Sequence, residues 1–252
     1  MRILVACGGG HDRDVLCAAG FHDVLITGIG CSQADAKACE PFSICSADVQ
    51  QLPFGDGSFD LTVVNYGLHH CRSPHRALLE LYRVSRKGVL VLESRDSLPL
   101  RAAIGIGAAS AYEMLPVILS NCQSGGVDNT PVPNFVYHWT EREVTKCIQS
   151  RAPEALHRIH FFYGLEIDTA TLKMNCGSLK YLAVCLAEPF LQLTARVIPR
   201  WGNRFAFFIE KPQYPRDLQP WITIQDGKPV MNETCVAGHP ASRATERMPP
   251  TQ

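Results

Sequence analysis

Three consecutive glycines, Gly8 to Gly10, follow the apolar run Ile3–Ala6 near the start of the chain. Glycines let a ligand approach the backbone closely. The segment that follows, from Asp12 to Ala19, has the composition of a helix, whose first amide groups can bind an anion. The pattern indicates a turn that cradles a nucleotide-like cofactor. Glycines can also serve only a tight turn, so the interpretation needs support from elsewhere in the chain.

Further residues suited to ligand binding come directly after later apolar runs. These are Gly30, Asp48, the segment Asn65–His70 and the segment Glu93–Asp96. Ligands of open parallel sheets bind beyond the carboxyl ends of the strands. We therefore expect these residues to gather around one site.

Histidines offer acid–base chemistry for such a site. His69 and His70 lie at the exit of the fourth apolar run, where an imidazole can take a proton from an acceptor. We expect His69 to be a general base and His70 to hydrogen-bond to the following loop. His138, beside Trp139, is a second catalytic candidate, or an ordinary loop residue that helps to start a helix.

The elements that must position these residues alternate between strands and helices. Apolar runs predict strands near residues 3–6, 23–30, 42–49, 61–70, 88–96, 158–167 and 203–212, with helices at 12–19, 34–40 and 74–85 among the first five strands. Continuous apolar strands that alternate with helices indicate an α/β fold. We expect a Rossmann-like, doubly wound, mostly parallel seven-stranded sheet with helices on both faces.

The pattern changes after Asp96. The most apolar stretch, residues 102–120, contains Glu113 and Pro116, which favours a partly buried helix lining a cavity over a membrane span. Thr140 and Glu143 form a capping box that predicts a helix start.

These features set the expected domain limits. Residues 1–211 form one domain with an inserted lid and acceptor site at about 97–150. Residues 179–197 are helical with a break near Pro189. Residues 212–252 form a C-terminal extension, disordered from about residue 232.

One long block carries a family resemblance. The stretch ADVQQLPFGDGSFDLTVVNYGLHH, residues 47–70, is followed by RALLELYRVSRKGVLVLE, residues 76–93. Together they resemble the core of class I S-adenosylmethionine-dependent methyltransferases, particularly the type 11 group, with its Leu-Pro-Phe segment and Leu-His-His exit. The resemblance covers about residues 3–94 and implies S-adenosylmethionine as cofactor.

The resemblance also implies which residues contact the cofactor. Asp48 accepts a hydrogen bond from the adenine amino group, and the Val49 amide meets the ring. Asn65 and Tyr66 line the floor near the sulfonium, while Asp60 fixes the loop before its strand. The full implied set is Cys7, Gly8, Gly9, Gly10, Gly30, Asp48, Val49, Asn65, Tyr66 and Leu68.

Two departures from the family pattern concern the glycines and the ribose. The family's three glycine positions fall on Cys7, Gly9 and His11 in one register, or on Gly8, Gly10 and Asp12 in the other. The acid that usually grips the ribose after the second strand is replaced by Gly30. Loss of such a charge-assisted hydrogen bond costs roughly 1.5–3 kcal/mol, so we expect weakened rather than abolished cofactor binding.

The acceptor site is less distinct in the sequence. Arg95, Tyr112 and Trp139 are candidate acceptor contacts. The chain starts directly at its first strand, so we expect the segment after Asp96, or the partner subunit of a homodimer, to cover the cofactor.

Composition narrows the partners. Lys+Arg and Asp+Glu both number 24, so the net charge of zero gives no reason to expect nucleic acid. The 11 cysteines include no CxxC pair, and we interpret them as reduced, mostly buried thiols of a cytoplasmic protein. No ligand pair has zinc-binding spacing, so the sequence predicts no metal site.

We therefore expect a methyltransferase that acts on a small molecule, with oxygen as the favoured acceptor atom and nitrogen or carbon as alternatives. The missing ribose acid and irregular glycines leave open a non-catalytic or regulatory methyltransferase-like protein. A nicotinamide-dependent oxidoreductase would require an acid at position 30 and gives no account of the block from Ala47 to His70.

Overall fold

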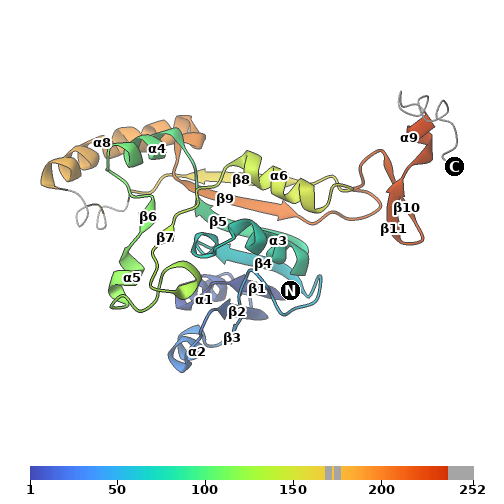
Figure 1. Cartoon of the computed structure of the whole chain (residues 1–252), viewed down its shortest axis with the longest axis horizontal. Coiled ribbons are helices and arrows are strands. Elements are labelled where there is room, and N and C mark those ends of the chain that lie inside the picture. The colour runs from blue at the N-terminus through green and yellow to red at the C-terminus, as the bar shows by residue number, and fades with distance from the viewer. Residues whose placement is uncertain (168–171, 173–176, 238–252) are drawn as a thin grey trace, which may run out of the picture.

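The computed structural model describes residues 1–167, 172 and 177–237 of the chain. Its centre is a seven-stranded sheet with the strand order β3-β2-β1-β4-β5-β9-β8 (Figure 1). The strands are β1 (Ile3–Ala6), β2 (Val24–Gly28), β3 (Ser43–Ser46), β4 (Phe59–Asn65), β5 (Ser85–Ser94), β8 (Ile159–Gly164) and β9 (Arg204–Glu210). Strands β1 to β5 are parallel, and β9 is antiparallel to β5 and β8. The expected mostly parallel, Rossmann-like sheet is confirmed.

Helices cover both faces of the sheet around β1. Leu4 and Ala6 belong to the larger of two cores, which we call the main core and which includes buried residues of α3 (Pro74–Val84) and α6 (Glu141–Arg151). Ile3 and Val5 face a second core, to which α1 (Gly10–Ala18) and α2 (Gln33–Cys39) contribute. All four residues of β1 are buried. A strand covered on both sides must be apolar throughout, which explains the unbroken run in the sequence.

The strand order places the exits of three strands together. Strand β1 pairs with β2 on one side and with β4 on the other. The connection after β1 therefore runs toward one edge of the sheet, and the connection that leads into β4 returns to the other side of β1. This switch point is where open α/β sheets leave a crevice. The glycines after β1, Gly30 after β2 and Tyr66 after β4 all lie there.

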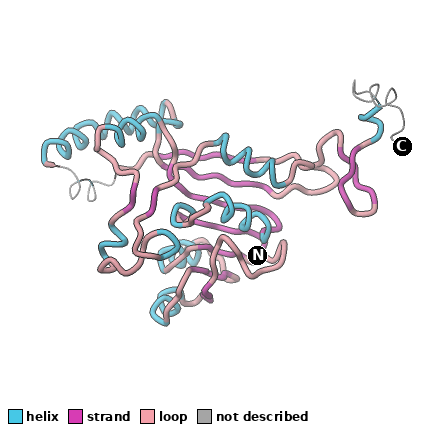
Figure 2. The backbone as a smooth tube through the Cα atoms, in the orientation of Figure 1, coloured by secondary structure: helices cyan, strands magenta, loops and turns pink. Residues whose placement is uncertain are grey.

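The segment between β5 and α6 differs from the expectation. The expected helix over residues 102–120 is wrong: the chain forms α4 (Leu98–Gly105), β6 (Tyr112–Glu113) and α5 (Leu115–Leu119) instead. Strand β6 pairs with β7 (Asn134–Phe135), and Figure 2 shows mostly loop between these short elements. We call residues 97–139 the lid. Helix α6 lies outside it, because Val144 and Ile148 are buried in the main core.

The C-terminal part also departs from the expectation in places. Helix α8 (Ser178–Val197) continues through Pro189, so the expected break there is wrong. Strands β10 (Ile222–Gln225) and β11 (Lys228–Met231) form a hairpin, and α9 (Glu233–Ala237) follows. The expected disorder from about residue 232 stays a prediction, because residues 238–252 lie outside the described residues. Among the described helices, none has the length and apolar character needed to cross a membrane.

The cysteines are free but less buried than expected. Among the described residues every cysteine is a free thiol, and only Cys39 and Cys71 are buried. The expectation of mostly buried thiols is therefore wrong. Cys7 and Cys71 are of interest because both lie at the strand exits described next.

Candidate functional site

A cavity of about 480 Å³ lies at the exits of β1, β2 and β4. We call it the glycine cavity. Its volume is in the range of small-molecule and cofactor sites. Seven of the expected cofactor residues line it: Cys7, Gly8, Gly9, Gly10, Gly30, Val49 and Tyr66.

The three glycines meet different surroundings. A Cβ on Gly8 would lie 2.6 Å from Val5 Cγ1, and one on Gly10 would lie 3.3 Å from the Ala38 carbonyl oxygen. A Cβ on Gly9 would have nothing within 4 Å. A side chain at position 8 would force its surroundings to shift, and one at position 10 would be tight, which favours the register Gly8, Gly10 and Asp12. Asp12 supports this turn by accepting a hydrogen bond of 2.9 Å from the Gly9 amide.

The ribose side of the glycine cavity holds no acid at the end of β2. Gly30 has a φ of 70°, a backbone conformation that suits glycine. Asp35 lines the cavity, but its carboxylate accepts hydrogen bonds from the Ser32 amide (2.8 Å) and hydroxyl (2.7 Å) as the cap of α2. The lid brings the Asn129 amide here, where its Nδ2 donates to the Ile29 carbonyl at 3.4 Å.

Three other expected cofactor residues do not line the glycine cavity. The exposed Asp48 accepts hydrogen bonds from the Gln50 amide and side chain. Asn65 donates to Asp12 at 3.3 Å and so steadies the glycine turn. Leu68 is buried in the main core. Their direct contacts with the cofactor stay predictions.

The lid of this same chain covers the glycine cavity. Pro116, Gly125, Gly126, Asp128 and Asn129 contribute to its wall. Asp128 Oδ1 accepts from Gln50 Nε2 at 3.0 Å, and Asp128 Oδ2 pairs with Arg72 Nε at 2.7 Å. We call these contacts of Asp128 with Gln50 and Arg72 the lid latch. Sequence analysis missed them because the three residues lie far apart along the chain.

A second cavity, of about 260 Å³, lies beside the first. We call it the aromatic cavity. Its lining includes Tyr112, Phe135 and Tyr137 from the lid and His69 from the exit of β4. Cys71 lines both cavities, whereas His70 lines the glycine cavity. The two neighbouring histidines therefore stand between the two spaces.

The ring of His69 lies between the carboxylates of two glutamates. Its Nδ1 is 2.9 Å from Glu93 Oε2, and its Nε2 is 3.4 Å from Glu113 Oε2 of the lid. Burial alone would lower the pKa of His69, but the hydrogen bonds and charges of Glu113 and Glu93 outweigh it and raise the pKa to about 10. Glu93 is fully buried and also accepts from the Leu68 amide at 2.7 Å. Sequence analysis missed both carboxylates as partners of His69.

His70 contacts the lid rather than the loop that follows it. Its Nδ1 is 2.6 Å from Nδ2 of Asn134, and its Nε2 is 3.4 Å from Glu113 Oε2. Burial and the neighbouring charge of His69 lower the pKa of His70. The expected bond to the following loop is replaced by a bond to β7.

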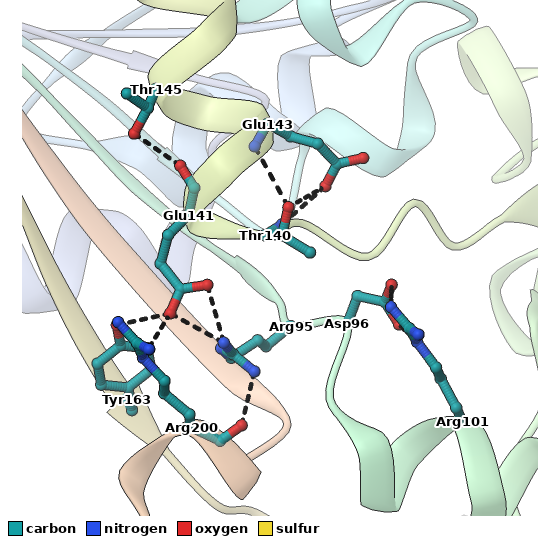
Figure 3. Close-up of polar contacts among 9 residues, drawn as sticks. All are labelled: Arg95, Asp96, Arg101, Thr140, Glu141, Glu143, Thr145, Tyr163 and Arg200. Carbon is teal, nitrogen blue, oxygen red and sulfur yellow. Dashed lines mark hydrogen bonds and ion pairs between the residues drawn. The ribbon is translucent and has the colours of Figure 1, made fainter.

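Arg95 and Trp139 are placed in structural surroundings. Arg95 is bound by both carboxylate oxygens of Glu141, at 2.8 and 2.9 Å, and donates to the Arg200 carbonyl at 2.6 Å (Figure 3). Trp139 is fully buried in the main core. Neither residue lines a cavity described above, whereas Tyr112 lines the aromatic cavity. The acceptor contacts of all three residues stay predictions.

His138, the second catalytic candidate, lines neither cavity. It is half-buried, and burial lowers its pKa. It directly precedes Trp139, whose amide donates to the Ser94 carbonyl at 2.9 Å and fixes the end of the lid against β5. A catalytic role for His138 stays a prediction.

Comparison with known proteins identifies the domain that carries the glycine cavity. A family profile described as a methyltransferase domain matches residues 3–92. Demethylmenaquinone methyltransferase of Renibacterium salmoninarum is 28% identical over 96 residues, which span 38% of this chain and 40% of that protein. The ubiquinone/menaquinone biosynthesis C-methyltransferase UbiE of Bdellovibrio bacteriovorus is 36% identical over 87 residues, 27% of this chain and 37% of that protein. The matches thus span well under half the length of these relatives.

The fold has a broader match. An S-adenosylmethionine-dependent methyltransferase from Mesorhizobium loti aligns over 83% of this chain and 90% of its own, with a TM-score of 0.50 and 14% identity. At that identity the likeness shows the fold, including strands that the sequence matches do not reach.

Proposed function

Residues 3–92 place this chain among the class I S-adenosylmethionine-dependent methyltransferases, and from that premise we propose that it methylates a small molecule bound in the aromatic cavity. The observation that carries the proposal is the arrangement of the two cavities. Cys71 lines both, and His69 and His70 separate them. A donor in one cavity and an acceptor in the other would meet over a short distance, and positioning of this kind is a large part of catalysis.

The glycine cavity suits the cofactor. The open side of Gly9 and the glycine at position 30 leave the backbone accessible, and the amides at the start of α1 are beside them. The bound cofactor would supply a methyl group already activated on a sulfonium. The chain's own residues then have three tasks, which are to hold the donor, to exclude water with the lid and to orient the acceptor.

The aromatic cavity favours a flat acceptor with a hydroxyl group. Tyr112, Phe135 and Tyr137 offer apolar ring surface for it. Because the raised pKa keeps His69 protonated at neutral pH and its two ring nitrogens pair with Glu93 and Glu113, the ring has neither a free N–H for an acceptor oxyanion nor a free nitrogen that could take a proton. Its role as a general base would require the neutral ring. The named quinone-biosynthesis relatives also support a flat acceptor, and the C-methyltransferase among them supports carbon as an alternative methylated atom. We propose oxygen as the methylated atom, with carbon or nitrogen as the alternatives.

The proposal is tested by methyl transfer from labelled S-adenosylmethionine to a panel of phenols, quinols and hydroxylated lipids, with amines of similar shape alongside. We expect label in an ether product from an aromatic hydroxyl compound. Transfer only to amines would contradict the acceptor class, and binding of the cofactor without transfer to any compound would favour the regulatory alternative.

The lid latch gives a separate prediction. Asp128→Ala removes the bonds to Gln50 and Arg72 and should weaken S-adenosylhomocysteine binding by about tenfold, because the lid would cover the glycine cavity less often. Asp56→Ala is the matched control, since it removes a similar arginine pair, with Arg83, outside both cavities. Calorimetry measures both, and equal affinities in the two variants would contradict a latch.

The remaining expectations also belong to the proposal. The net charge of zero supports a small-molecule partner rather than nucleic acid, and the free thiols fit a reducing, cytoplasmic compartment. Homodimer formation is supported by the exposed apolar residues of α8, which are Leu179, Leu182, Leu186, Phe190, Leu193 and Val197. Sedimentation measures the oligomeric state directly.

A further inference from the structure

Two histidines and a carboxylate converge between the glycine cavity and the aromatic cavity. One ligand atom from each of His69, His70 and Glu113 lies within 4.8 Å of the others. Glu113 comes from β6 in the lid, while both histidines come from the turn after β4. We propose that Nε2 of His69, Nε2 of His70 and the Glu113 carboxylate bind one divalent transition-metal cation of the zinc type.

The separations of the donor atoms suit a metal ion. Oε2 of Glu113 is 3.4 Å from Nε2 of His69 and 3.4 Å from Nε2 of His70. Charge-assisted hydrogen bonds between nitrogen and oxygen are shorter, at about 2.7–2.9 Å. Ligands of a tetrahedral zinc ion, each about 2.0–2.1 Å from the metal, lie roughly 3.3 Å apart. The two nitrogen–oxygen separations of 3.4 Å therefore match the distance between neighbouring ligands of a tetrahedral zinc ion better than the length of a charge-assisted hydrogen bond.

The groups behind the histidines hold both rings in the required orientation. Glu93 binds Nδ1 of His69 at 2.9 Å, and the Asn134 amide lies 2.6 Å from Nδ1 of His70. In both rings the Nδ1 atom is occupied and Nε2 points to Glu113. In metal-binding histidines a carboxylate or carbonyl oxygen fixes the ring and its tautomer, as Glu93 does for His69. The atom of Asn134 that faces His70 is the amide nitrogen.

Asn134 provides an independent sign of an incomplete site. The residue is fully buried, and its Oδ1 has no hydrogen-bond partner among the described residues. Buried oxygens without a donor are rare in folded proteins. Turning the amide by half a rotation gives up the 3.2 Å hydrogen bond that Asn134 Nδ2 donates to Glu113 Oε2. It lets Oδ1 accept the Nδ1 proton of His70 instead, and that tautomer leaves Nε2 free as a metal ligand.

The local charge also favours a cation. Glu93 and Glu113 both contact His69, and within the described part of the chain neither forms a salt bridge with a lysine or arginine. The two carboxylates carry two formal negative charges, which a divalent cation would balance.

The position suggests what the ion would do. His70 lines the glycine cavity and His69 lines the aromatic cavity, so an ion between their Nε2 atoms would border both spaces. Three protein ligands leave a tetrahedral ion one open position, as in catalytic zinc sites. If the proposed methyl transfer holds, an acceptor hydroxyl at that position would ionise more readily. Metal binding itself does not depend on that function.

Metal binding is tested on the full chain after treatment with a chelator. Calorimetry with Zn²⁺ should give one site per chain in the wild type. Glu113→Gln and His70→Gln each remove a proposed ligand and should weaken Zn²⁺ binding by at least the roughly 100-fold that loss of a group supporting a ligand can cost. His160→Gln is the matched control, because His160 also pairs with a glutamate, Glu210 at 2.7 Å, but on the surface. It should leave the affinity unchanged.

Cobalt distinguishes the proposed site from the cysteines. Co²⁺ should give the visible bands of a tetrahedral ion in the wild type and lose them in Glu113→Gln, without the intense near-ultraviolet band of cobalt–thiolate bonds. Absence of stoichiometric Zn²⁺ binding, equal binding in Glu113→Gln, or a thiolate band would each overturn the inference. Circular dichroism and a cooperative urea transition of the same samples show that the variants are folded. Binding of S-adenosylhomocysteine to the wild type, measured separately, distinguishes failure of the metal site from failure of the proposed function.

Discussion

Gly9→Val is expected to weaken S-adenosylhomocysteine binding at least about tenfold and to leave the fold intact. A Cβ at position 9 meets no protein atom within 4 Å, so the turn has room for a side chain at this position. The backbone there is extended, with a φ of −155°, which any residue adopts. Since Gly9 lines the glycine cavity, the added side chain would occupy space that the cofactor needs.

A matched variant separates this effect from general damage. Gly105 in α4 also has open space around a built Cβ, but it lines neither cavity. Gly105→Val should bind S-adenosylhomocysteine like the wild type in calorimetry. If Gly9→Val bound equally well, the cofactor could not lie against the glycine turn.

Glu93→Gln is expected to reduce stability at neutral pH, by an amount on the order of 1–3 kcal/mol, and to lower the pKa of His69. Glu93 is fully buried and holds Nδ1 of His69 at 2.9 Å. The pKa of His69 is raised in the folded state to about 10, so this contribution is complete below the unfolded value of 6.5 and is lost as the pH rises through about 10. The difference between wild type and variant should therefore shrink over that interval.

Urea unfolding at a series of pH values, with a chelator present, measures this difference. Glu210→Gln is the control, because it breaks the exposed pair with His160 and should change stability little at any pH. A wild type and a Glu93→Gln variant whose stabilities stay parallel from pH 6 to about 10 would show that His69 is not held protonated by this carboxylate.

The sheet and the glycine turn are predictable because their signals are local. Each parallel strand is buried on both faces, so β1 and β5 appear as apolar runs, and Thr140 with Glu143 forms the capping box that starts α6. The glycine positions follow directly from the end of β1. Such features need only neighbouring residues to be recognised.

The lid is not predictable in the same way. Strands β6 and β7 have two residues each, too few for a periodic pattern, and their pairing brings Glu113 beside Asn134. The contact between Glu113 and the two histidines depends on that pairing. The sequence gives no ligand spacing for the His69, His70 and Glu113 group, because its third member lies more than 40 residues from the first two.

The acceptor residues illustrate a second limit. Arg95 and Trp139 have side chains that often bind ligands, but the structure uses them to join the lid to the sheet. Arg95 is bound by Glu141, and Trp139 packs against Phe207 with ring centroids 6.0 Å apart. Residue type alone does not distinguish a ligand-binding side chain from one that joins the lid to the sheet. The difference depends on where the chain lies after it leaves β5.

A structure of the full chain with S-adenosylhomocysteine tests the central claim most directly. We expect the nucleoside in the glycine cavity, against Gly9 and Val49, with the sulfur turned toward His70 and the aromatic cavity. That placement would turn the methyl group of the cofactor toward an acceptor in the aromatic cavity. A ligand bound away from Gly9, or with its sulfur turned from the aromatic cavity, would contradict the account.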